Sequence, residues 1–318
     1  MKKLHVVLSI GSFAVASTLA YIVFADRPSS TQRTDTPSAA EVGLPNFLAP
    51  PASSHGAVPG PQALGVTASM ASAVATAEDL KKFADEAMKY PNKGGMAYAM
   101  GAISSCAGHS EYIARMRAKA PALAAGKDGT RRLAAIEDLE RRCRGFSEYE
   151  PSMHLYRQGL ERGDVVLVTV KRVTEAKGRS LDEQVQIAKE ALALKDPQVL
   201  SQMKSFAAVP SSNPKQGSVS YFDGRPYGGL GAADYYAAWE AAMCSFGKDC
   251  TSPREWAVVQ ACLQEGICVA NALELIKSEY ANQPARWEKV TALAARITQV
   301  VNDGDVQAFL PPKSRKAT

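Results

Sequence analysis

The sequence predicts an all-α protein in which an irregular bundle or short solenoid of antiparallel helical hairpins follows an N-terminal membrane segment and a disordered tether. Three observations predict this class. Residues 6–25 carry no charge, apolar residues recur three and four positions apart from Thr76 onward, and all six cysteines follow the uncharged segment. The spacing is that of helices with one apolar face, and no run of alternating β-branched residues indicates a sheet.

The first segment, residues 1–25, is a signal anchor or a signal peptide. Lys2 and Lys3 precede the uncharged residues 6–25, which as a helix reach roughly 30 Å, the thickness of one hydrocarbon core. Lysines left in the cytoplasm orient such a helix with its carboxyl end outside, whereas the small residue Ala25 also suits signal cleavage. Both alternatives make the remaining chain extracytoplasmic: anchored in the inner membrane and facing the periplasm, or periplasmic or secreted after cleavage near Ala25.

Residues 26–75 predict a disordered tether. This stretch is rich in Pro, Ser, Thr, Ala and Gly. It has too few large apolar side chains to offset the entropy of ordering.

Residues 76–208 predict a domain of helices with short joints. Gly163 followed by Asp164 provides a helix C-terminal glycine and then an N-capping aspartate, and Asp196 followed by Pro197 provides an N-cap and a proline in the first helical turn. With these joints, the central part resembles exported bacterial proteins built from tetratricopeptide-like helical hairpins. The resemblance implies stacked antiparallel hairpins and transfers no ligand site. An irregular bundle fits the same joints, because the sequence has no repeat of about 34 residues.

Residues 209–231 break the helical pattern with many turn-forming residues and three aromatics. Loops of this length in a compact domain are usually functional or disordered. The loop divides the first helical domain from a C-terminal helical subdomain, residues 232–310, and residues 311–318 form a basic tail.

Helix geometry selects one pairing among the four C-terminal cysteines. Cys250 and Cys262 flank a predicted helix, which holds them roughly 18 Å apart, whereas a disulfide allows about 7 Å between Cα atoms. An antiparallel hairpin brings the preceding Cys244 to Cys250. The predicted disulfides are therefore Cys244 with Cys250, Cys262 with Cys268, and Cys106 with Cys143.

Zinc is the competing use of these cysteines. The spacing of two to four residues that is typical of zinc pairs is missing, and an oxidising compartment favours disulfides. We expect no metal and no cofactor.

The stretch between Ile113 and Arg144 holds nine basic and four acidic residues, a net charge of +5. The formal net charge of the whole chain is also +5, so the rest of the chain is balanced. Such a patch can attract anionic lipid head groups or an acidic partner. A solvated helix face with a Glu137–Arg141 pair is the alternative. Nucleic acid is excluded as a partner by the location. The candidate contact residues are Arg115, Arg131, Arg132, Arg141 and Arg142.

Aromatic residues suggest a second surface. Tyr235 and Tyr236 are adjacent, so on a helix both cannot face one core. One of them, together with Tyr221 and Tyr227 of the long loop, is predicted to line a groove.

No catalytic motif is present in the sequence. His154 with Glu148 and Glu150, or His109, could provide acid–base chemistry. The favoured function is a non-enzymatic helical interaction protein of the bacterial cell envelope whose partner is an envelope protein or an anionic envelope component. The alternative is an envelope enzyme that acts on cell-wall or lipid substrates with the long loop and a His/Glu pair.

Overall fold

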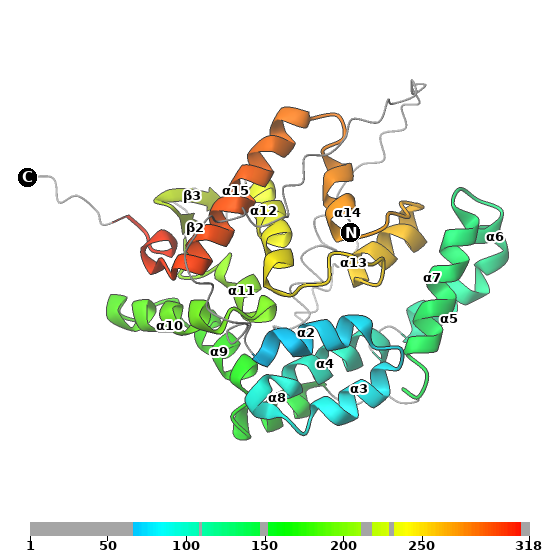
Figure 1. Cartoon of the computed structure of the whole chain (residues 1–318), viewed down its shortest axis with the longest axis horizontal. Coiled ribbons are helices and arrows are strands. Elements are labelled where there is room, and N and C mark those ends of the chain that lie inside the picture. Colours follow the sequence, from blue (N-terminus) through cyan, green and yellow to red (C-terminus); the bar gives the residue numbers. More distant parts are fainter. Residues whose placement is uncertain (1–65, 108–109, 147–151, 211–217, 229–231, 313–318) are drawn as a thin grey trace, which may run out of the picture. The chain divides into compact units, whose positions relative to one another are not determined.

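The computed structural model describes residues 66–107, 110–146, 152–210, 218–228 and 232–312, all within the unit Leu64–Thr318. These residues are mostly helical, and the strands make one small sheet (Figure 1). This confirms the coarse fold prediction. The predicted membrane segment lies outside the described residues, and among the residues that are described no helix has the length and apolar character to cross a bilayer.

The first described helix begins earlier than the sequence analysis expected. Residues 66–75 were assigned to the tether, but Val66–Thr76 is helical (α2). Alanine is the strongest helix former, and α2 packs against a neighbouring helix with Ala71 only 5% exposed. Small residues therefore suffice for burial where two helices approach closely. The N-terminal elements are α2, α3 (Leu80–Ala87), the 3-10 turn η1 (Pro91–Lys93) and α4 (Gly95–Cys106).

A close approach at Gly95 fixes the α3–α4 hairpin. A Cβ atom at this position would lie 1.9 Å from the backbone oxygen of Ala87. Only glycine fits there, because any side chain would push the two helices apart.

The predicted joints of the central helices are present, and their capping aspartates are buried. Asp164 and Asp196 are both 0% exposed, and their carboxylates accept hydrogen bonds from the first backbone N–H groups of α9 and α11. The central elements are α5 (Ser110–Ala118), α6 (Ala120–Ala124), α7 (Gly129–Arg142), α8 (Ser152–Glu161), α9 (Val165–Thr174), α10 (Leu181–Leu194) and α11 (Pro197–Met203).

Each of these two aspartates also holds α4. Asp164 Oδ2 accepts from the backbone N–H of Met96 at 2.8 Å, and Asp196 Oδ2 accepts from the Tyr98 hydroxyl at 2.8 Å. Burial, and then the negative charges of both aspartates, raise the pKa of Tyr98 far above its ordinary value, so its hydroxyl remains a donor. The first turn of α4 is thus joined to the caps of two other helices.

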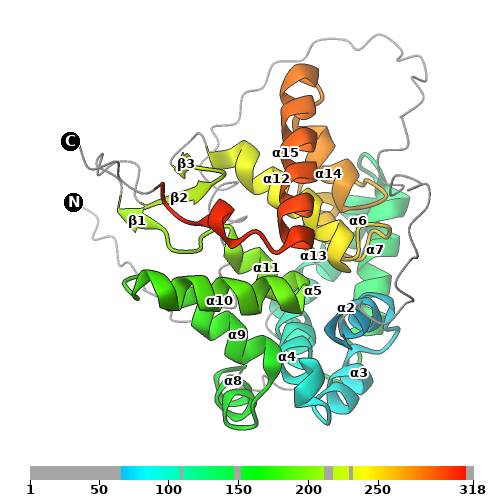
Figure 2. The same cartoon turned by 60° about the vertical axis from the view of Figure 1, so that its left-hand side comes forward.

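The segment expected to be a long loop contains an antiparallel sheet of order β1-β2-β3. Asp223 and Gly224, with φ of 49° and 70°, make the tight turn of the β2–β3 hairpin. Phe222 is 0% exposed and anchors the hairpin in the core, and Figure 2 shows the sheet beside α12 and the red C-terminal turn. The strands are β1 (Val209–Pro210), β2 (Ser218–Phe222) and β3 (Arg225–Gly228).

The C-terminal helices enclose an aromatic core. Trp239 is fully buried on α12 and Phe309 is 1% exposed, with ring centroids 6.0 Å apart. Helices α12 and α15 form the main pair of this region. Its elements are α12 (Ala233–Met243), η5 (Cys244–Phe246), α13 (Trp256–Gln260), the π-helical turn η6 (Ala261–Glu265), α14 (Ala272–Glu279), α15 (Pro284–Asp303) and η7 (Val306–Phe309).

All three predicted disulfides are present. The Cα–Cα distances are 5.2 Å for Cys106–Cys143, 5.5 Å for Cys244–Cys250 and 4.2 Å for Cys262–Cys268. Three disulfides are consistent with an oxidising extracytoplasmic compartment.

Candidate functional site

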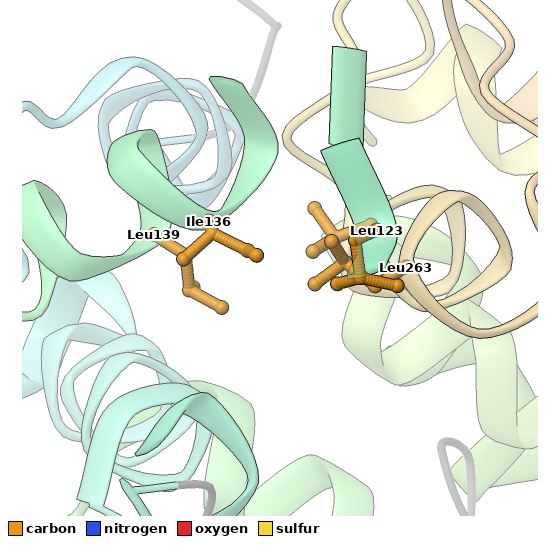
Figure 3. Close-up of a cluster of buried hydrophobic side chains, with 5 residues drawn as sticks. Leu123, Ile136, Leu139 and Leu263 are labelled. Carbon is orange, nitrogen blue, oxygen red and sulfur yellow. The ribbon is translucent and has the colours of Figure 1, made fainter. Parts of the chain in front are cut away.

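Helices α5, α6 and α7 form an arm, residues 110–143, that is attached to the rest of the domain. The Cys106–Cys143 disulfide joins the end of α4 to the end of α7. A hydrophobic cluster also joins the arm to α13 and η6. Figure 3 shows Ile136 and Leu139 of α7 turned toward Leu123 of α6 and Leu263 of η6. The arm is therefore fixed by a covalent bond and by a packed interface.

One of the predicted surface arginines, Arg142, holds the arm to α2. Arg142 is only 6% exposed, and its guanidinium donates to the carbonyls of Ala77 at 2.8 Å and Val74 at 3.0 Å. These carbonyls follow or end α2, where a cation is favoured. Burial lowers the pKa of Arg142 from its usual value.

Arg141 belongs to a charge network at the same end of the arm. It pairs with Glu78 and Asp138, and Arg254 pairs with the same two carboxylates at 2.8 and 3.2 Å. The network replaces the Glu137–Arg141 pair considered from the sequence. Hydrogen bonds from Arg254 and Arg141 lower the pKa of Glu78. Arg141 and Arg142 thus have internal partners and are unsuited to a partner-binding patch.

Arg131 and Arg132 donate to the carbonyls around the Cys262–Cys268 disulfide. Arg131 Nη1 donates to the Cys268 oxygen at 2.9 Å, and Arg132 Nη2 donates to the Leu263 oxygen at 2.6 Å. Arg131 also lies 3.8 Å from Asp128. The sequence placed both arginines on one surface with Arg115, whereas the structure uses part of their donor capacity at the junction between arm and η6.

Basic charge nevertheless remains on the arm. Arg115, Lys119 and Lys127 are exposed, and in the described part of the chain none of them forms an ion pair. Arg117, on the same helix, differs because it lies 3.7 Å from Glu140. The arm therefore retains a smaller basic surface than the sequence predicted.

The aromatic surface differs from its prediction. Tyr235 is 1% exposed and Tyr236 is 40% exposed, which confirms that only one of the pair faces the core. Tyr227 stacks on Tyr235 with centroids 4.2 Å apart. Tyr221, however, pairs in register with Pro226, while Tyr227 pairs with Ser220. Cross-strand partners share a face, so Tyr221 and Tyr227 lie on opposite faces of the hairpin and do not line one groove.

The residues of the enzyme alternative are mostly outside the described part. His109, Glu148 and Glu150 fall there, and His154 is exposed on the first turns of α8. Within the described residues, no three His, Cys, Asp or Glu side chains are grouped as a metal would require. No observation adds support to the acid–base interpretation.

One polar residue at the arm junction was missed by the sequence analysis. Tyr112 of α5 packs against Trp256 at 5.8 Å, and its hydroxyl is buried with no hydrogen-bond partner among the described residues. A tyrosine on the apolar face of a short helix gives no sequence signal that distinguishes this role from core packing.

Comparison of the chain with protein-family models, with curated proteins and with solved structures gave no match.

Proposed function

We propose that this protein is a non-enzymatic helical interaction protein of the bacterial cell envelope that binds an anionic envelope component through its arm. Residues 6–25 would anchor it in the inner membrane facing the periplasm, or it would be released after cleavage near Ala25. The tetratricopeptide-like resemblance is compatible with this role, since stacked hairpins commonly serve as binding scaffolds.

The observation that carries the proposal is the exposed, unpaired charge of Arg115, Lys119 and Lys127 on a rigid arm. A basic side chain near an anionic surface contributes about 1 kcal/mol to binding. Because the disulfide and the hydrophobic cluster already hold the arm, little ordering entropy opposes association. Charge that is not neutralised internally remains for a partner.

Sedimentation of the oxidised full-length chain with washed bacterial envelopes tests the proposal. We expect binding that weakens as NaCl is raised. At low salt, Arg115→Glu with Lys119→Glu should weaken it by more than about 30-fold, because the two lost attractions alone are worth about 2 kcal/mol and like-charge repulsion adds to the loss. The matched control reverses two exposed lysines elsewhere, Lys189→Glu with Lys289→Glu. Equal loss in both variants, or binding that is insensitive to salt, would contradict the proposal.

A further inference from the structure

We propose that the Cys262–Cys268 disulfide is a redox-sensitive latch, which holds the far end of the arm and releases that end when a dithiol reduces it. The latch concerns how the arm is held, so it is tested separately from what the arm binds.

The arm is bonded covalently to the domain at one end only. Cys143 follows the last turn of α7 and is joined to Cys106. Arg131 and Arg132 lie in the first turn of the same helix, which begins at Gly129. At 1.5 Å of rise per residue, roughly 20 Å of helix separates the two ends. The far end of the arm therefore needs an attachment of its own.

The loop closed by Cys262 and Cys268 provides this attachment. Arg131 Nη1 donates to the Cys268 carbonyl at 2.9 Å, and Arg132 Nη2 donates to the Leu263 carbonyl at 2.6 Å. Leu263 directly follows Cys262, so the two acceptors come from the two ends of the loop. Hydrogen bonds from charged donors are stronger than those between neutral groups.

The disulfide joins two chain segments that pack in different places. Leu263 belongs to the hydrophobic cluster that contains Leu123 of the arm. Val269, next to Cys268, packs against a second cluster that contains Val258. The carbonyls that receive the two arginines are thus parts of different packing units, and the disulfide holds them at a fixed separation.

The backbone of the turn does not itself hold Cys268. The last hydrogen bond of the turn runs from the Ile267 N–H to the Ala261 carbonyl at 3.1 Å. Within the part of the chain that the structure describes, the N–H groups of Cys268 and Val269 donate to no backbone carbonyl. The position of the Cys268 carbonyl beside the turn therefore depends on the disulfide.

Reduction by a dithiol transfers two electrons to the disulfide. A thiolate of the reductant bonds to the sulfur of Cys268, which is half-buried. The sulfur of Cys262, a residue only 5% exposed, leaves as a thiolate and takes up a proton. The second thiol of the reductant then loses its proton and bonds to the first, which displaces the Cys268 sulfur as a thiolate that is also protonated. The protein gains two thiols, and the reductant becomes a disulfide.

Opening the loop loosens the far end of the arm and leaves its base attached. The Cys268 carbonyl is then no longer fixed relative to that of Leu263, so the two arginines lose their paired acceptors. The base keeps the Cys106–Cys143 disulfide. An oxidising compartment keeps the latch closed, and a dithiol opens it.

Hydrogen exchange of the full-length chain in detergent tests the latch in Cys262→Ser with Cys268→Ser. We expect the amides of residues 120–132 to exchange about tenfold faster or more, since the loss of one hydrogen bond from a charged donor accounts for a factor of this size. Residues 136–142, at the base, should exchange as in the wild type.

Cys244→Ser with Cys250→Ser is the matched control. This pair closes a loop with the same sequence separation of 6, and no arm side chain donates to that loop within the described residues. The control should leave exchange in the arm unchanged. Arg131→Met with Arg132→Met keeps the disulfide and removes the two donors, so it should loosen residues 120–132 as the open loop does.

Titration of the wild type with dithiothreitol, followed by alkylation and peptide mapping, tests the redox response. Exchange in residues 120–132 should rise together with the alkylation of Cys262 and Cys268, while the far-UV circular dichroism stays unchanged.

The proposal is overturned if the open loop leaves the arm as protected as in the wild type, or if both cysteine variants loosen it equally. It is also overturned if Cys262 and Cys268 react only when the far-UV signal is lost. Salt-dependent envelope sedimentation would then leave the proposed function standing. A working latch in a chain that does not sediment with envelopes would contradict the proposed function alone.

Discussion

Replacement of Asp164 tests whether the helical joints hold the domain together or only cap single helices. Its Oδ1 accepts from the backbone N–H groups of Val166 at 3.1 Å and Leu167 at 3.0 Å, and its Oδ2 accepts from that of Met96 at 2.8 Å. Asp164→Ala removes an N-cap, worth about 1 kcal/mol. It also leaves the buried Met96 N–H without an acceptor, which costs about 1–3 kcal/mol.

Burial offsets part of that loss. It raises the pKa of Asp164 more than the backbone N–H groups lower it, so removal of the carboxylate relieves some desolvation. We therefore expect Asp164→Ala to lower the free energy of unfolding at pH 7 by about 2–3 kcal/mol, measured by urea unfolding with an unchanged m-value.

Asp79→Ala is the matched control. Asp79 is an exposed N-cap whose carboxylate, within the described residues, accepts only from Lys82 N–H, at 2.9 Å, so its loss should cost about 1 kcal/mol. Asp164→Asn keeps the capping oxygen but replaces the acceptor of the Met96 N–H with a donor, and should fall between the two. A cost for Asp164→Ala that does not exceed the cost for Asp79→Ala would refute the claim that this cap joins separate helices.

Three further predictions concern the disulfide, the hairpin and the partly exposed carboxylate of Glu240. Replacing Cys106 and Cys143 together by serine should lower the free energy of unfolding by about 4 kcal/mol on the loop-closure model; a loss below about 1 kcal/mol in calorimetry or urea unfolding would contradict it. Phe222→Ala should lower the free energy of unfolding by about 3–5 kcal/mol because its ring is fully buried. Tyr221→Ala, on the other face of the hairpin, should lower it by less than about 1 kcal/mol. Equal losses would argue against the β2–β3 register. Burial alone would raise the pKa of Glu240, but two adjacent lysines lower it to about 2. The ionised carboxylate therefore stabilises the fold fully above its unfolded pKa of about 4.3, and this contribution is lost as the pH falls toward 2. Acid unfolding curves of Glu240→Gln should lack this pH-dependent loss of stability.

The sequence predicted local chemistry better than tertiary partners. Helix-capping residues predict the joint at Asp164, and expected helix lengths predict the two short C-terminal disulfides, because both depend on neighbours along the chain. Cys106–Cys143, with a sequence separation of 37, followed only as the remaining pair. That Asp164 also binds α4 could not be predicted, since its second acceptor meets Met96 only in the folded domain. The hairpin had a usable signal in Asp223–Gly224 between aromatic residues, which is typical of a tight β-turn.

The basic patch shows the same limit. Its composition is evident from the sequence, but the sequence does not show which of its residues have partners within the fold. Arg142 binds α2 carbonyls and Arg132 binds a carbonyl of η6, whereas Arg115 has no carboxylate partner among the described residues. These outcomes depend on which distant elements lie beside α7, and net charge carries no such information. Tyr112 was missed because its unpartnered hydroxyl is a property of three-dimensional packing.

The most direct test of the account is photo-cross-linking in intact cells that produce the full-length chain. A photoreactive residue is placed at Lys119 on the arm or, in a second variant, at Lys289 on α15. The recovered protein is then analysed by intact-mass measurement. The account predicts an adduct with an anionic envelope component from Lys119 and none from Lys289, on a chain that lacks the six thiol hydrogens of its three disulfides. Free thiols, or equal adducts from both positions, would contradict it.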